Sequence, residues 1–134
     1  MKRTLTILIV LLVAAAGLNL GQTKDQLNPR AVENLLAGIH SENLGLQKSS
    51  MFFAGYYKIE ETVEALREEM LSNENPSVKI LAALALYEIH NENVLEDFDR
   101  LAKDINEDLK VRRMIKAIYD EWEVNNRMTL TVSK

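Results

Sequence analysis

Few side chains in this sequence are of the types that perform acid–base or metal chemistry, and they are far apart. His40 and His90 are the only histidines, and each follows a segment with helical periodicity. A cationic ring near the exposed carbonyls of a helix end is favourable, which gives both residues a structural role. Because no carboxylate stands at ligand spacing from either ring, we predict no metal site.

The sequence also contains no motif for nucleophilic catalysis or for cofactor binding. The 134 residues contain no cysteine, which excludes disulfides, thiol catalysis and thiolate metal sites. No nucleophile elbow, P-loop, dinucleotide fingerprint, zinc-protease helix or calcium loop occurs. We therefore expect a protein without catalytic residues or a cofactor. An enzyme of unrecognised type is an alternative that a deep pocket joining His90 to carboxylates would support.

A dense run of glutamates is the first candidate for a binding surface. Glu60, Glu64 and Glu68 recur at four-residue intervals and are joined by Glu61 and Glu69. Such a face is either simply solvated or a docking surface for a cationic partner. Paired catalytic carboxylates need an enclosing pocket to separate their pKa values, and one helix face does not provide one.

An aromatic group is the second candidate. Phe52, Phe53, Tyr56 and Tyr57 occupy positions i, i+1, i+4 and i+5, a band wider than one core stripe. Either neighbouring helices pack on both sides of this helix, or some of the rings form an anchor surface for a protein partner.

The charge balance argues against nucleic acid as a partner. The net charge is -4, with 16 basic and 20 acidic residues, so the chain as a whole repels phosphate backbones. The last helical segment nevertheless carries a basic cluster. We expect its members to pair with the nearby Asp104, Glu107 and Asp108 rather than with phosphate. The cluster consists of Lys110, Arg112, Arg113 and Lys116.

The N-terminus has the three-part layout of a secretory signal. Lys2 and Arg3 precede an apolar run from Leu5 to Ala16, which small residues follow. The run is shorter than the ~20 residues that cross a bilayer, so we predict cleavage rather than an uncleaved anchor. The predicted organisation is a signal peptide over 1–21, a linker over 22–28, a helical domain over 29–122 and a flexible tail over 123–134. The mature protein would be exported, periplasmic or extracellular, with no membrane span.

Apolar periodicity in the mature part predicts helices and little else. Asn28 with Pro29, and Asn75 with Pro76, offer a capping side chain followed by a residue suited to the first helical turn. A period of about 32 residues relates the later segments. Self-similarity of this length is typical of stacked helical pairs. The predicted helices cover residues 29–39, 46–58, 60–71, 78–89, 92–103 and 107–122, with 78–89 as the buried central helix.

Two kinds of residue pair recur within residues 46–122. Val78-Lys79 and Val111-Arg112 stand near the start of a predicted helix, and Ala85-Leu86 and Ala117-Ile118 stand near its end. In this pattern the segment resembles short bacterial HEAT-type repeats, in which a Val-Arg or Val-Lys pair opens the first helix and an Ala-Leu pair closes it. The resemblance implies an all-α fold, a short right-handed α-solenoid of about 2.5 stacked antiparallel helix pairs. It also implies a scaffold for protein contacts, because the repeat itself brings no catalytic residues.

These observations favour an exported, non-enzymatic module that binds a protein or peptide, with a basic one preferred. The helices over 60–71 and 92–103 would line a shallow acidic face, concave if the geometry follows the resemblance. Alternatively, both ends of a short stack stay apolar and the chain self-associates as a homo-oligomer. The expected contact residues are Glu61, Glu64, Glu68, Asp97 and Arg100, together with Phe52, Tyr56 and Tyr57 of the aromatic group.

Overall fold

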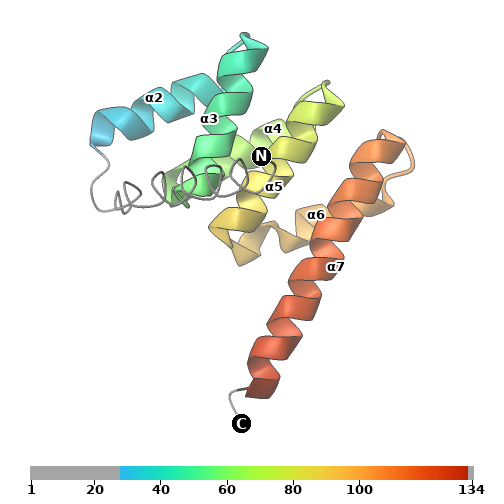
Figure 1. Cartoon of the computed structure of the whole chain (residues 1–134). Helices are drawn as coiled ribbons and strands as arrows, with labels where there is room; N and C mark the ends of the chain where they lie inside the picture. Colours follow the sequence, from blue (N-terminus) through green and yellow to red (C-terminus); the bar gives the residue numbers. More distant parts are fainter. Residues whose placement is uncertain (1–27, 133–134) are drawn as a thin grey trace, which may run out of the picture.

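The computed structural model describes the backbone of residues 28–132 and the side chains of residues 28–126. The predicted signal peptide and nearly all of the predicted linker lie outside this range. Within it every regular element is helical, which confirms the all-α prediction (Figure 1). The elements are α2 (Pro29–Ile39), α3 (Leu44–Tyr56), the short 3₁₀ helix η2 (Glu60–Thr62), α4 (Val63–Ser72), α5 (Pro76–Ile89), η3 (Glu92–Val94), α6 (Leu95–Lys103) and α7 (Leu109–Val132).

Asparagine side chains cap the N-termini of three of the α-helices. The Oδ1 atom of Asn28 accepts a hydrogen bond from the Arg30 backbone N–H at 2.9 Å, and that of Asn75 accepts one from Ser77 at 3.0 Å. Each cap precedes a proline in the first turn, as predicted. Asn43 caps α3 in the same way, so that helix begins at Leu44, two residues before its predicted start. Such caps satisfy backbone donors that the first turn of a helix leaves free.

The last helix is longer than predicted. It starts after Asp108, whose Oδ1 accepts hydrogen bonds from the backbone N–H groups of Lys110 and Val111. It then continues to Val132, ten residues beyond the predicted end of the last helix at residue 122. The physical reason is that no glycine or proline interrupts the segment, and polar residues on an exposed face do not end a helix.

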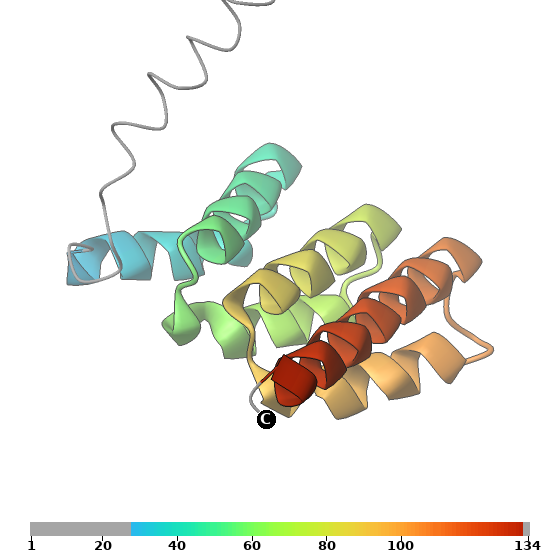
Figure 2. The same ribbon diagram turned by 60° about the horizontal axis from the view of Figure 1, so that its bottom comes forward.

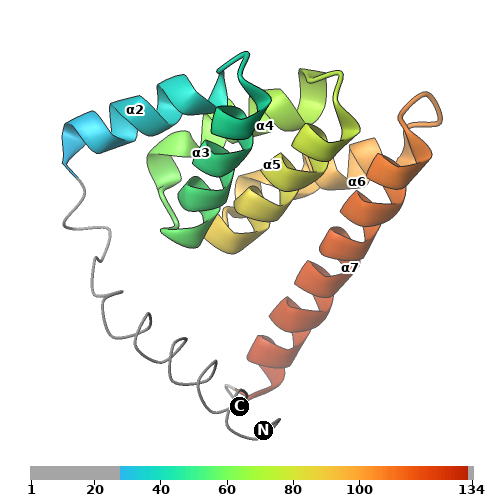
Figure 3. The ribbon, with the colours of Figure 1, turned by 45° about the horizontal axis from the view of Figure 1, so that its top comes forward.

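The helices form two layers. In one layer α3, α5 and α7 run side by side, and α4 and α6 lie in the other (Figure 2). The central helix α5 contacts α3, α4 and α7, whereas α6 packs mainly on α7. Helix α2 packs crosswise against α3, and the far end of α7 extends beyond the other helices (Figure 3).

A single apolar core runs through both layers, from Ile39 in α2 to Trp122 in α7. Helix α5 supplies much of it, with Val78, Ala82 and Leu86 fully buried. Close approach of the helices depends on small residues. A Cβ atom added at Gly55 of α3 would lie 2.8 Å from the Cα of Ala85 in α5, nearer than two such carbons come in proteins.

One burial expectation is wrong. Helix α5 was predicted to be the buried central helix, but Leu84 and Glu88 keep one of its faces exposed. Leu109, an apolar residue in the first turn of α7, is also exposed, at 54%.

Candidate protein-interaction surfaces

Three buried or half-buried polar side chains tie successive helices together instead of forming a reactive site. Gln47 Nε2 donates to the Ile39 carbonyl at 2.8 Å, and Lys79 Nζ lies 3.3 Å from the Leu71 carbonyl. Arg112 Nε donates to the Ala102 carbonyl at 3.4 Å. Each therefore binds a carbonyl at the end of the preceding helix or just before it, where the helix itself provides no donor. The three residues lie 32 and 33 apart, so the same tie recurs along the chain.

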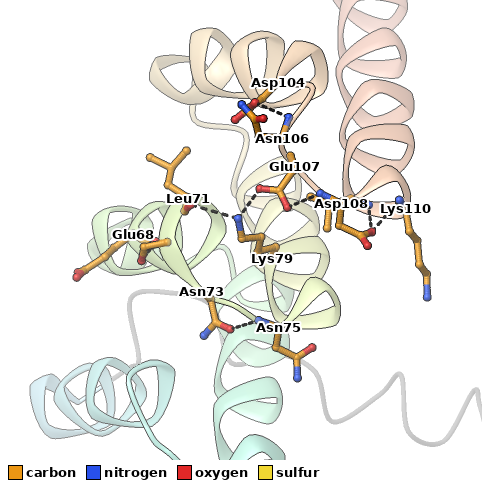
Figure 4. A network of polar contacts seen from close by, with 12 residues as sticks. Glu68, Leu71, Asn73, Asn75, Lys79, Asp104, Asn106, Glu107, Asp108 and Lys110 are labelled. Atoms are coloured by element: carbon orange, nitrogen blue, oxygen red, sulfur yellow. Dashed lines mark hydrogen bonds and ion pairs between the residues drawn. The ribbon is translucent and has the colours of Figure 1, made fainter.

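Lys79 has a second partner in the loop before α7. Its amino group is 2.5 Å from the carboxylate of Glu107, and both side chains are nearly buried (Figure 4). The predicted pairing of Glu107 with the basic cluster of the last helix is therefore wrong. Asp104 and Asp108 accept hydrogen bonds from backbone N–H groups instead, as caps of the turn and of α7. Lys116 pairs with Asp120 on its own helix at 2.6 Å.

Asp97 belongs to the interior and not to a binding face, which corrects its predicted role. Its residue is 4% exposed, and its carboxylate lies 2.5 Å from Arg67 Nε and 2.6 Å from Arg100 Nη2. The hydrogen bond from Arg67 to Asp97, followed by the attraction between their charges, raises the pKa of the guanidinium. Asp97 thus links α4 to α6, and Arg100 is partly committed to it although it remains mostly exposed.

The predicted acidic face carries mixed charge. Glu61, Glu64 and Glu68 are exposed as expected. Arg67, however, lies between them in the helix and forms an ion pair with Glu64 at 3.7 Å. Glu69 points elsewhere and accepts hydrogen bonds from Gln47 Nε2 and Asn73 Nδ2. A shallow hollow of about 450 Å³ on this face is lined by His40, Glu64, Ala65, Arg67, Glu68 and Leu71.

Both histidines end helices, as predicted, and the ring of each contacts another side chain. His40 Nδ1 lies 3.0 Å from Glu69 Oε1. His90 adopts a left-handed backbone conformation, and its ring stacks on Trp122 at a centroid distance of 4.5 Å. Among the described residues no group of three or more potential ligands stands close enough to hold a metal ion.

The aromatic surface, which we define as Phe52, Phe53, Tyr56 and Tyr57 of α3, is largely open to solvent. Phe52, Phe53 and Tyr56 are 54%, 45% and 47% exposed. Phe52 stacks on Tyr56 at 5.8 Å and Phe53 on Tyr57 at 6.2 Å, so the rings form a continuous patch. Helices α2 and α5 both pack on α3, but neither covers these three exposed rings, so packing by neighbouring helices does not bury them.

A groove between α3 and α5 continues this patch. Its volume is about 450 Å³. Gly55 and Ala85 meet at its base, where the absence of a side chain on Gly55 lets the helices approach. The α5 side of the groove could not be predicted from the sequence, because residues 78–89 were expected to form a buried helix. Its lining consists of Met51, Phe52, Gly55 and Tyr56 from α3 with Leu81, Leu84, Ala85 and Glu88 from α5.

No helix among the described residues has the length and apolar character needed to cross a membrane. Comparisons of the chain with protein-family models, with curated proteins and with solved structures find no match.

Proposed function

We propose that this chain is an exported, non-enzymatic helical module that binds an amphipathic helix of a partner protein on the aromatic surface and the adjoining groove. The observation that carries the proposal is the exposure of three large aromatic side chains beside an apolar groove. Aromatic side chains supply much of the energy at protein interfaces, and an exposed cluster of them is costly for a protein that never covers it.

The chemistry of the groove suits one kind of partner. Seven of its eight lining residues carry no charge, and Glu88 is the one carboxylate among them. An occupant with apolar side chains at helical spacing and a lysine or arginine near Glu88 satisfies both features. The net charge of -4 also favours a positively charged partner.

The recurring ties support a HEAT-like stacking of helix pairs. Gln47, Lys79 and Arg112 repeat one contact at a spacing of 32 and 33 residues. Two layers of parallel-running helices suit such stacking, in which each pair buries the apolar side of the next. A scaffold of this kind presents surfaces for recognition, and we place recognition on α3 and α5.

A designed peptide tests the site. The probe is a fluorescent helix built only from leucine and lysine, with the leucines at helical spacing, and binding is followed by anisotropy. We expect Phe52→Ala and Tyr56→Ala each to weaken binding at least tenfold, since anchor residues contribute about 2 kcal/mol or more. Ile105→Ala is the matched control, because Ile105 is 81% exposed in the loop before α7 and outside the groove.

Two further variants separate this site from the acidic face of α4. Glu88→Lys should weaken binding and reduce its dependence on salt. Reversing Glu64 and Glu68 to lysine should leave the affinity nearly unchanged. If the reversed pair abolishes binding while Phe52→Ala and Tyr56→Ala do not, recognition belongs to α4 and the proposal is wrong.

A further inference from the structure

Along the exposed side of α7, basic and acidic residues stand in the opposite order to the one that stabilises a helix. The first turn of α7 contains no acidic residue, and Lys110 and Arg113 are exposed near its N-terminal end. Cations at this end oppose the helix dipole and cost stability. Asp120 and Glu121 follow farther along the helix. The exposed side is therefore basic toward the start of α7 and acidic toward its middle.

This side is also unpartnered among the described residues. The buried side chains Val111, Ile115 and Trp122 face the core, whereas Met114 and Val124 are 39% and 53% exposed. A hollow of about 490 Å³ lies on the exposed side. It is lined by Asp108, Leu109, Lys110, Arg113, Met114 and Ala117.

We infer that a second copy of this chain covers the exposed side of α7 in an antiparallel helix pair. A twofold axis at Ala117 places residues equally far before and after it opposite one another. Arg113 and Glu121 are each four residues from Ala117, so Arg113 of one copy meets Glu121 of the other, twice per dimer. In the same register Lys110 lies opposite Val124, where its aliphatic stem packs on an apolar side chain.

The residue at the centre of the pair fits this arrangement. Ala117 is exposed and small, which lets two helices approach to the ~8 Å of close packing. Glu121 stays within reach of the partner although it also lies beside the Tyr87 hydroxyl, because a carboxylate accepts several hydrogen bonds. The contact extends along part of a helix of 24 residues, so it belongs to the small class of interfaces with micromolar affinity.

Charge reversal tests both the contact and its direction. Sedimentation velocity of the purified protein at low salt, over a range of micromolar concentrations, should show a monomer–dimer equilibrium that weakens as salt is added. Arg113→Glu alone and Glu121→Arg alone each place like charges opposite one another, so each should weaken association at least tenfold. The double variant R113E/E121R restores both pairs and should recover the dimer.

Mixing the two single variants is the most specific test. A heterodimer of the R113E and E121R chains pairs opposite charges at both contacts, so the mixture should associate although neither variant does so alone. Far-UV circular dichroism controls for folding. A monomer at every concentration, single variants that dimerise like the original protein, or a mixture that stays monomeric overturns the inference. So does a dimer that Phe52→Ala abolishes and Arg113→Glu does not, since it would form through the aromatic surface.

Discussion

At the scale of single residues, the buried polar groups of this protein serve the architecture. Asp97 joins α4 to α6 through Arg67 and Arg100, and Lys79 joins α5 to the loop before α7 through Glu107. A buried carboxylate or ammonium group is tolerated only when its partners replace the water it has lost. The ionisable groups with the most partners are therefore not candidates for catalysis, and substitutions at them should change stability first.

Asp97→Asn tests this reading. The substitution removes the negative charge between two guanidinium groups, and we expect it to lower the free energy of unfolding by about 1–3 kcal/mol. The loss stays below that of a fully buried pair because both arginines reach solvent. Asp99→Asn is the control, since Asp99 pairs with Lys103 at the surface and should cost less than about 0.5 kcal/mol. Urea unfolding of both variants measures the difference, and equal losses would contradict the structural role of Asp97.

Tyr87 gives the protein a dependence on alkaline pH. Burial, followed by the charge of Glu121, raises the pKa of its hydroxyl above the ordinary value of 10.0. As pH rises through 10 the unfolded chain releases this proton while the folded chain keeps it, so the free energy of unfolding falls. Tyr87→Phe removes this contribution, and its stability should decline less between pH 9.5 and pH 11 than that of the original protein. At pH 7 the variant should lose only about 0.5–1.5 kcal/mol, for the hydrogen bond from Asn125. An alkaline decline equal to that of the original protein would show that Tyr87 does not cause it.

At the scale of elements, local sequence signals predicted where helices begin better than where they end or which side they expose. Asn28, Asn75 and their prolines are local signals, because a cap acts within three residues. The end of α7 is not marked by any residue, so the prediction stopped where the apolar pattern weakened. The exposure of Leu84 depends on how far apart α3 and α5 lie, which Gly55 and Ala85 determine through contacts between distant parts of the chain.

Gly55→Ala tests that spacing. The new methyl group would meet backbone atoms of Ala85, which cannot move aside as a flexible side chain can, so α3 and α5 must separate. We expect a loss of about 1–3 kcal/mol in stability. Gly45→Ala is the matched control near the start of the same helix, where the methyl group meets only the end of the Asn43 side chain. Its effect should stay within about 1 kcal/mol, because the gain in helix propensity offsets the contact. Thermal unfolding of the two variants compares them, and a neutral Gly55→Ala would show that the helices are not in close contact.

At the scale of the whole molecule, the sequence predicted an all-helical chain but not which helix faces stay uncovered. Composition and the recurring pattern are averages over many residues, so single errors do not change the helical class. A surface, in contrast, depends on which helix faces the other helices leave uncovered. From the sequence, the aromatic side chains of α3 were compatible both with burial between helices and with an exposed anchor surface. Asp97 was predicted to lie on the surface because charged residues are usually solvated. Only the packing of α6 against its neighbours shows that Asp97 lies inside.

The continuous core makes a final prediction about cooperativity. Trp122 is the only tryptophan, and it is fully buried against Tyr87, His90 and Phe98, where α5, α6 and α7 meet. Its fluorescence therefore reports one end of the molecule, whereas far-UV circular dichroism reports all helices. Because α5 contacts both α3 and α7, we expect the two signals to change together in urea, as in a two-state transition.

A substitution at the opposite end makes the prediction sharper. Met51 of α3 is fully buried, and Met51→Ala should cost about 2–5 kcal/mol. If the layers unfold as one unit, this substitution lowers the urea midpoint measured by Trp122 fluorescence as much as the midpoint measured by circular dichroism. A fluorescence midpoint that stays unchanged while the dichroism midpoint falls would mean that α2 and α3 unfold separately. The aromatic surface would then belong to a unit with its own stability, and partner binding on α3 would stabilise that unit without protecting the environment of Trp122.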